Sequence, residues 1–143
     1  MENIIQILKV QKLNNNAKLP NKTHMSDAGI DLFANENVVL YPENTLLVST
    51  GIAMEIPEGY CGIIKDRSSM GAKGVFTLGG VIDSSYRGEI KIIMGTKDTY
   101  VVNRGDKIAQ MLLVPVPSVE IVEVESLSET ERGSGGFGST GNK

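Results

Sequence analysis

The feature that most constrains the fold of this chain is a series of short β-prone runs separated by turn residues. Several runs alternate polar and apolar residues with a period of two, most clearly at 89–92 and 122–125. Turn-forming residues, such as those at 57–59 and 103–106, lie between the runs, and no window shows sustained helical periodicity. The pattern predicts an all-β sandwich or barrel, with strands expected at 4–10, 38–40, 45–56, 60–65, 75–78, 89–94, 100–102, 107–116 and 119–125.

One helix and one change of composition interrupt the β pattern. A short helix is predicted from Arg67 to about Lys73, with Asp66 as a possible N-cap. The length of 143 residues fits a single domain. We expect a β domain at 1–126 and a C-terminal arm at 127–143.

The arm contains a glycine-rich stretch at 132–141, in which half of the residues are glycine. Such a composition is typical of a flexible linker or a disordered end. Arg132 and Phe137 argue against a pure linker, which has no use for a guanidinium and a ring at fixed places. A glycine-rich backbone can also surround phosphate oxygens with its N–H groups, although the stretch lacks the Gly-Lys-Ser/Thr ending of a P-loop.

Composition excludes several classes of function. The formal net charge of −3 gives no sign of electrostatically driven nucleic-acid binding. No apolar stretch approaches the length of a membrane span, and the first residues do not resemble a secretory signal. The single cysteine, Cys61, excludes an internal disulfide framework and fits a reducing compartment. We therefore expect a cytoplasmic protein that binds neither membranes nor nucleic acids.

The segment 80–89 carries the strongest chemical signal. Asp83 comes directly after an apolar run, and Tyr86 follows three residues later, before Arg87 and a new β-prone run. A carboxylate and an aromatic ring are thus expected on one tight turn. This arrangement suits a small site that needs a base and a flat apolar surface.

Three further patterns point to a polar ligand, each beside an ordinary structural alternative. Arg67, Ser68 and Ser69 offer a guanidinium fork, hydroxyls and free helix N–H groups, which together favour a phosphate; the alternative is a capped surface helix. Gln110 is a polar residue within an apolar β-prone run and could bind a polar ligand. The alternative is that it is the outward-facing residue of an alternating strand. Asp31 lies among small and apolar residues. If it is buried, its carboxylate needs hydrogen-bond or ion-pair partners; the alternative is that it caps a turn.

The order of these patterns resembles that of a known family. Five segments occur in the order of the five motifs of the trimeric deoxyuridine triphosphate nucleotidohydrolases, the dUTPases, and they span residues 28 to 141. The segments are Ala-Gly-Ile-Asp-Leu-Phe-Ala (28–34), Arg-Ser-Ser (67–69), Gly-Val-Ile-Asp-Ser-Ser-Tyr-Arg-Gly-Glu (80–89), Gly-Asp-Lys-Ile-Ala-Gln (105–110) and Arg-Gly-Ser-Gly-Gly-Phe-Gly-Ser-Thr-Gly (132–141).

The resemblance implies a jelly-roll-like β fold and Mg²⁺-dependent hydrolysis of dUTP to dUMP and pyrophosphate. That reaction limits uracil incorporation into DNA and supplies dUMP for thymidylate synthesis. It also implies a homotrimer with sites shared between subunits. Asp83 would activate the water that attacks the α-phosphorus. No side chain would bind Mg²⁺ directly, since the substrate phosphates and waters would hold it, with Asp31 accepting from a metal-bound water.

The resemblance also implies how the nucleotide is held. Tyr86 would lie under the deoxyribose and exclude a 2′-hydroxyl, and the hairpin around it would recognise uracil through its backbone. Arg132 would reach the γ-phosphate, Phe137 would stack on uracil, and the arm would close over the site as a lid. The expected substrate-binding residues are Arg67, Ser68, Ser69, Gly80, Val81, Ile82, Asp83, Tyr86, Lys91, Gln110, Arg132, Ser134, Gly136, Phe137, Gly138, Ser139 and Thr140.

One departure and two alternatives accompany this interpretation. Asp66 stands where the family often has proline, and it would either weaken triphosphate binding through its charge or cap the helix. A dCTP deaminase-like enzyme is the first alternative, but Asp83, Tyr86 and the arm with Phe137 favour triphosphate cleavage. A non-catalytic nucleotide-binding regulator is the second, although such a protein would not need Asp83.

Overall fold

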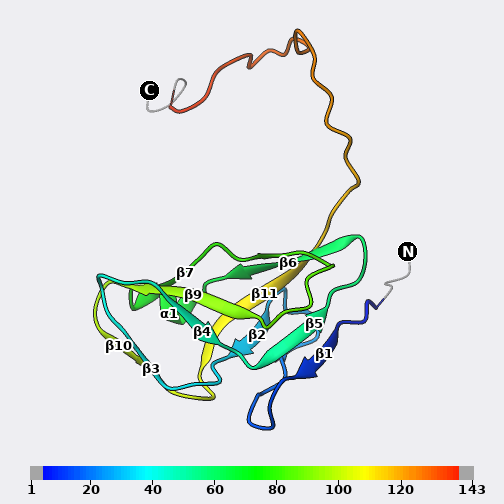
Figure 1. The fold of residues 1–143 in the computed structure, drawn as a ribbon. Helices are drawn as coiled ribbons and strands as arrows, with labels where there is room; N and C mark the ends of the chain where they lie inside the picture. The colour runs from blue at the N-terminus through cyan, green and yellow to red at the C-terminus, as the bar shows by residue number, and fades with distance from the viewer. Residues whose placement is uncertain (1–4, 139–143) are drawn as a thin grey trace.

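A computed structural model of the protein describes residues 5–138, in which short strands and one helix follow one another (Figure 1). Within this range, no helix has the length and apolar character that a membrane crossing requires. In chain order the elements are β1 (Lys9–Lys12), β2 (Ile30–Phe33), β3 (Val38–Leu40), β4 (Leu46–Ser49), β5 (Ile52–Glu55), β6 (Tyr60–Lys65), α1 (Ser68–Ala72), β7 (Val75–Leu78), β8 (Val81–Ile82), β9 (Lys91–Thr96), β10 (Tyr100–Val102) and β11 (Lys107–Pro115).

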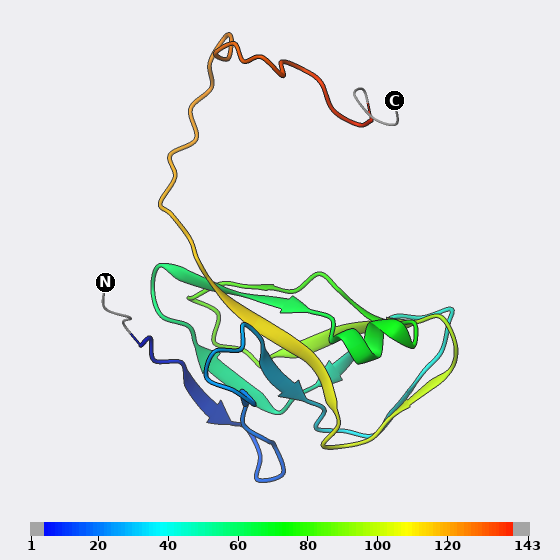
Figure 2. The ribbon, with the colours of Figure 1, turned by 180° about the vertical axis from the view of Figure 1, so that it is seen from behind.

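Two antiparallel sheets form the body of the protein. The first has the strand order β2-β11-β6-β8, the second has the order β4-β9-β7, and two further pairs join β1 to β5 and β3 to β10. Leu32 and Met111 of the first sheet belong to the same buried cluster as Val48, Ile92 and Met94 of the second. The sheets therefore pack face to face, as Figures 1 and 2 show from opposite sides. The predicted all-β, jelly-roll-like fold with one short helix is confirmed.

The inner strand β11 aligns several residues of the predicted site. Gln110 is paired with Asp31 of β2 on one side and with Lys65 of β6 on the other. A register shift between Lys107 and Ala109 marks a β-bulge, a feature that redirects neighbouring side chains. The end of the sheet that carries Asp31 and Gln110 is therefore also the end at which β6 runs into α1.

The structure confirms some predicted strand bounds and corrects others. The strands expected at 38–40, 60–65, 75–78 and 100–102 have those bounds. The run 119–125 is not a strand in the described chain, because the last strand ends at Pro115 and nothing pairs with the run. Its alternating pattern satisfies only one requirement of a strand, since a strand also needs a partner for its backbone N–H and C=O groups.

Other corrections concern bounds and a cap. The run expected at 45–56 contains two strands, β4 and β5. The strand expected at 4–10 begins and ends later than predicted, as β1 at Lys9–Lys12. Neither β2 nor β8 was predicted as a strand. The N-cap of α1 is Arg67, with extended backbone and no side-chain capping bond, so Asp66 does not cap the helix.

Candidate active site

Most of the predicted site residues outside the C-terminal arm fall into two groups at opposite ends of β6. The Arg67 cluster comprises Asp31, Arg67, Ser68, Ser69, Lys107 and Gln110, where β6 leads into α1. The Asp83 loop comprises residues 80–89, which begin beside β6, pass through β8 and lead into β9.

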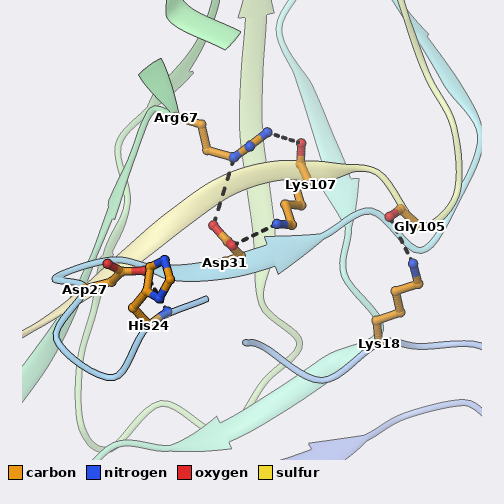
Figure 3. Close-up of polar contacts among 7 residues, drawn as sticks. All are labelled: Lys18, His24, Asp27, Asp31, Arg67, Gly105 and Lys107. Carbon is orange, nitrogen blue, oxygen red and sulfur yellow. Dashed lines mark hydrogen bonds and ion pairs between the residues drawn. The ribbon is translucent and has the colours of Figure 1, made fainter. Parts of the chain in front are cut away.

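Ion pairs hold the Arg67 cluster together (Figure 3). Asp31 Oδ2 lies 3.3 Å from Lys107 Nζ, and Asp31 Oδ1 lies 4.0 Å from Arg67 Nε. Arg67 Nη1 also donates to the Lys107 carbonyl at 3.3 Å. The side chain of Asp31 is only 18% exposed, so its carboxylate requires such partners. Asp31 therefore acts as the shared counter-ion of two cations.

Gln110 extends this cluster across the sheet. Its Nε2 donates to the Asp66 carbonyl at 2.8 Å, so the amide is directed towards the entry of α1. Gln110 is thus more than an outward-facing strand residue, because it links β11 to the segment that carries Arg67.

Ser68 and Ser69 form the first turn of α1. Both side chains are exposed, and neither hydroxyl has a hydrogen-bond partner within residues 5–138. Backbone N–H groups at the start of a helix have no partner within the helix. Hydroxyl and backbone donors therefore lie in the same turn as the Arg67 guanidinium, an arrangement that suits an anion.

Asp66 does not cap the helix, and its side chain bonds to β7 instead. Its Oδ1 accepts from Thr77 N and from Thr77 Oγ1, each at 2.6 Å. The carboxylate thus joins the end of β6 to β7, while the Asp66 carbonyl accepts from Gln110. Asp66 holds the entry of α1 in place through both its side chain and its backbone.

The Asp83 loop is a tight turn fixed mainly by hydrogen bonds to backbone atoms. Tyr86 N donates to the Asp83 carbonyl at 3.1 Å, which closes the turn. Tyr86 Oη donates to the Glu89 carbonyl at 2.8 Å, and Arg87 Nη1 donates to the Ser84 carbonyl at 2.6 Å. A Cβ on Gly88 would lie 2.4 Å from Tyr86 Oη, so only glycine lets the ring fold back over the turn.

A glycine also sets the start of this loop. Gly80 has φ of 103°, and a Cβ there would lie 2.7 Å from Ile64 Cβ. The Gly80 carbonyl accepts from Ile64 N at 2.7 Å. Gly80, one of the predicted ligands, thus holds the loop next to β6 through a backbone hydrogen bond, and its lack of a side chain permits this close approach.

A groove of about 270 Å³ lies along the Asp83 loop. Five of the predicted ligands line it, and Glu89 and two apolar residues of the neighbouring sheet complete its wall. Its volume lies just below the range usual for whole ligand sites, which fits the nucleoside part of a nucleotide. The lining residues are Leu47, Val81, Ile82, Asp83, Tyr86, Glu89, Lys91 and Ile93.

One chain does not bring the two groups together. Asp83 follows Ile82, which is paired with Gly62, so Asp83 lies near the start of β6. Arg67 follows Lys65 at the other end. At a rise of about 3.3 Å per residue, the strand from Gly62 to Lys65 alone separates the groups by about 10 Å. A ligand that contacts both groups of one copy must therefore span at least this distance.

The C-terminal arm is a third separate part of the predicted site. It leaves the body after β11 and runs away from both groups (Figures 1 and 2). Arg132 Nε donates to the Gly135 carbonyl at 2.6 Å, which forms a small turn within the arm, and Phe137 is fully exposed. Ser134, Gly136 and Gly138 lie in this same stretch, whereas Ser139 and Thr140 lie outside the described residues.

The structure also shows residues that the sequence reasoning missed. Lys107 pairs with Asp31, and Glu89 lines the groove. Both belong to the motif segments quoted above, and this position could have identified them as site residues. Thr77, the partner of Asp66, has no such signal, because only the packing of β7 brings it there.

Comparisons with known proteins agree with this geometry. A sequence model of the dUTPase family matches residues 15–141. The deoxyuridine 5'-triphosphate nucleotidohydrolase of Clostridioides difficile is 45% identical over 139 residues, which cover 94% of this chain and 97% of that protein. Its counterpart from Clostridium tetani is 47% identical over 140 residues, which cover 94% of this chain and 96% of that protein.

Solved structures give the same result. The dUTPase of Staphylococcus bacteriophage 80alpha with dUPNHPP matches with a TM-score of 0.88 and 31% identity, covering 96% of this chain and all of that one (100%). A mutant dUTPase from phage phi11 of S. aureus, whose structure describes the coordination of a structural Mg(II) ion, matches with a TM-score of 0.80 and 31% identity over 85% of this chain and 98% of that one.

The fold and the two groups define a class of protein: an all-β sandwich with a cationic cluster at one end of β6 and an aspartate–tyrosine loop at the other. Within that class, the sequence matches decide the family. The chain belongs to the dUTPase family.

The Arg67 cluster is suited to the oxygens of a phosphate. Within residues 5–138, no group of three or more His, Cys, Asp or Glu side chains could hold a metal ion. The two oxygens of Asp31 lie near Lys107 and Arg67, its counter-ions in the described residues. The cations and hydroxyls of the cluster offer donors to phosphate oxygens, and a phosphate could in turn carry Mg²⁺.

Proposed function

We propose that this protein hydrolyses dUTP to dUMP and pyrophosphate. The observation that carries the proposal is the Asp83 loop, which places a carboxylate and the Tyr86 ring on one fixed turn along a groove, in a chain of the dUTPase family. The reaction would limit uracil incorporation into DNA and supply dUMP for thymidylate synthesis.

Asp83 accepts the proton of the attacking water in this proposal. Its side chain is exposed, and within residues 5–138 its carboxylate oxygens accept no hydrogen bond from the protein. They are therefore free to accept one from a water, as a general base must. The water then attacks the α-phosphorus and pyrophosphate leaves.

Tyr86 selects the sugar in the same groove. The residue is 45% exposed and its hydroxyl is already bonded to the Glu89 carbonyl. The ring can therefore offer its face to the deoxyribose, where a 2′-hydroxyl would clash. Val81, Ile82 and Lys91 complete the groove on the side of the base.

The Arg67 cluster binds the phosphates. Arg67 and Lys107 now share Asp31 as counter-ion, so an arriving triphosphate would gain two cations and the hydroxyls of Ser68 and Ser69. Mg²⁺, bound to the phosphate oxygens, would offset their charge during attack. Asp31 would keep the two cations oriented and accept from a metal-bound water.

The separation of the two groups supports a homotrimer with shared sites. Asp83 and Arg67 lie at opposite ends of β6, and in this proposal a second copy supplies the phosphate-binding cluster to each Asp83 loop. The stretch 119–127 exposes large apolar side chains, with Ile121 at 94%, as expected of a surface that another copy covers. The arm with Arg132 and Phe137 would then close over the site.

One assay tests the function. The protein is incubated with Mg²⁺ and each of dUTP, dCTP, dTTP and UTP, and pyrophosphate release and base identity are followed. Release from dUTP alone supports the proposal. Loss of the amino group from dCTP would show a deaminase, and binding without turnover would show a non-catalytic regulator.

A second measurement tests the assembly. Sedimentation equilibrium should give three times the chain mass of 15.4 kDa, and a monomer with full activity would refute the shared site. A cytoplasmic location remains a prediction from the sequence.

A further inference from the structure

We propose that Glu89 is a positioning residue that ties the Tyr86 ring to the β4–β5 turn and so sets the selectivity between deoxyribose and ribose. The proposal rests on the function proposed above. Glu89 does not need to touch the reacting atoms for this role, because it acts through Tyr86.

Glu89 makes contacts in two directions. Its side-chain Oε2 accepts from Ser49 Oγ and from Gly51 N, the latter at 3.0 Å. Ser49 is the last residue of β4, and Gly51 lies in the turn that follows. Its main-chain carbonyl accepts from Tyr86 Oη at 2.8 Å. One residue therefore connects the ring to a different part of the sandwich.

The turn that receives Glu89 is a firm support. Ile90, the next residue, is fully buried. Its N donates to the Ile52 carbonyl at 2.8 Å, and its carbonyl accepts from Thr50 Oγ1. Hydrogen bonds to a half-buried carboxylate are charge-assisted and stronger than neutral ones. The chain at 89–90 is thus fixed by both its side chain and its backbone.

The ring of Tyr86 depends on this support. Within residues 5–138, its hydroxyl makes one hydrogen bond, which goes to the Glu89 carbonyl, and Tyr86 as a residue is nearly half exposed. If the side chain of Glu89 were released from Ser49 and Gly51, the peptide unit of Glu89 and Ile90 would keep, besides the bond from Tyr86, only its bond to the Ile52 carbonyl, and the Glu89 carbonyl and the ring could shift together by a small amount. Steric exclusion of a 2′-hydroxyl changes steeply with distance, so a small shift should admit ribose.

The chain offers a matched control in Glu36. Its Oε2 accepts from Ser49 N at 2.7 Å, so it bonds to the same turn as Glu89 and is also half-buried. Within residues 5–138, Glu36 has no hydrogen bond to the Asp83 loop. Loss of Glu36 should therefore disturb the turn without releasing Tyr86.

The test compares kcat/KM for dUTP and UTP in the wild type and in Glu89→Ala, Glu89→Gln, Ser49→Ala and Glu36→Ala. We expect Glu89→Ala to lower the dUTP/UTP ratio by about 10- to 100-fold, the effect of a small misplacement. Glu89→Gln keeps an acceptor and should recover most of the ratio. Ser49→Ala, which removes one donor, should give an intermediate loss, and Glu36→Ala should leave the ratio within about twofold of the wild type.

A second readout does not depend on turnover. NMR of tyrosine-labelled protein should show the Tyr86 ring signal moved in Glu89→Ala and unmoved in Glu36→Ala. Circular dichroism establishes that each variant is folded, and Ser49→Ala replaces Glu89→Ala if the latter is not.

The outcomes separate the two proposals. A wild type that does not cleave dUTP overturns the proposed function and the selectivity role together, while the Tyr86 signal still decides whether Glu89 holds the ring. A wild type that prefers dUTP, with an unchanged ratio and an unchanged Tyr86 signal in Glu89→Ala, overturns the role of Glu89 alone.

Discussion

The Arg67 cluster and the Asp83 loop are built on different physical principles. Charged side chains from separate elements form the cluster, where Asp31 is shared between Arg67 and Lys107. The loop is formed by hydrogen bonds to its own carbonyl oxygens, such as that from Tyr86 to Glu89. The cluster gathers two cations around one carboxylate from separate elements, whereas the loop is held by bonds within one short segment.

This difference indicates separate roles for the two groups in binding and in catalysis. A set of paired cations can adapt to a flexible, highly charged triphosphate, and it contributes mainly to affinity. A fixed turn can hold a base and a ring at set positions, and it contributes to the chemical step and to selectivity. Variants in the two groups should therefore change different kinetic parameters.

The largest expected effect tests the loop. Asp83→Asn keeps the size and shape of the side chain but removes its ability to take a proton. We expect kcat to fall by about 10²- to 10⁴-fold, the usual contribution of a general base. Binding of a non-hydrolysable dUTP analogue, measured by calorimetry, should stay near the wild-type value. Retained turnover would remove Asp83 as the base.

The next effect tests the cluster. Arg67→Ala removes a charged donor and leaves Asp31 with Lys107 alone. We expect the affinity for the triphosphate to fall by about 10- to 100-fold, the range for a lost charge-assisted hydrogen bond. Affinity for dUMP should change much less, because it lacks the β- and γ-phosphates. Equal losses for dUTP and dUMP would contradict the assignment of Arg67 to the phosphates.

A third variant tests the arm against both groups. Deletion of residues 132–143 should lower kcat/KM for dUTP by about tenfold or more, because water is then no longer excluded from the site. The melting temperature should stay unchanged, since Arg132 and Phe137 bond to nothing outside the arm within residues 5–138. Full activity after deletion would return the stretch to the role of a linker.

Sequence reasoning identified the residues of each group better than their arrangement. The strand at 60–65 was predicted with its observed bounds, because turn residues end the apolar run on both sides. Asp83 and Tyr86 were predicted on one turn because only three residues separate them. Local spacing carries this information, and the hydrogen bond from Tyr86 N to the Asp83 carbonyl confirms the turn.

Arrangement depends on contacts between distant segments, which one sequence does not display. The ion pair of Asp31 with Lys107 follows from the pairing of β2 with β11, and the bond of Glu89 with Ser49 joins segments 40 residues apart. The position of the two groups at opposite ends of β6 also depends on strand order. The alternating run at 119–125 shows the opposite error, since its pattern predicted a strand without a partner.

The smallest expected effect concerns Asp66, the residue that stands in place of the family's common proline. Its carboxylate accepts two hydrogen bonds from Thr77, and its carbonyl accepts one from Gln110. Asp66→Ala should therefore loosen the entry of α1, raise KM for dUTP a few-fold and lower the free energy of unfolding by about 1 kcal/mol.

Two companion variants determine whether charge or position is responsible. Asp66→Asn keeps an acceptor for Thr77 and should leave KM near the wild-type value. Thr77→Val removes only the hydroxyl donor, so it should reproduce part of the effect of Asp66→Ala. If instead Asp66→Asn lowered KM, the negative charge of Asp66 itself would oppose binding of the triphosphate. The affinity of the Arg67 cluster would then depend on repulsion by Asp66 as well as on the counter-ion Asp31.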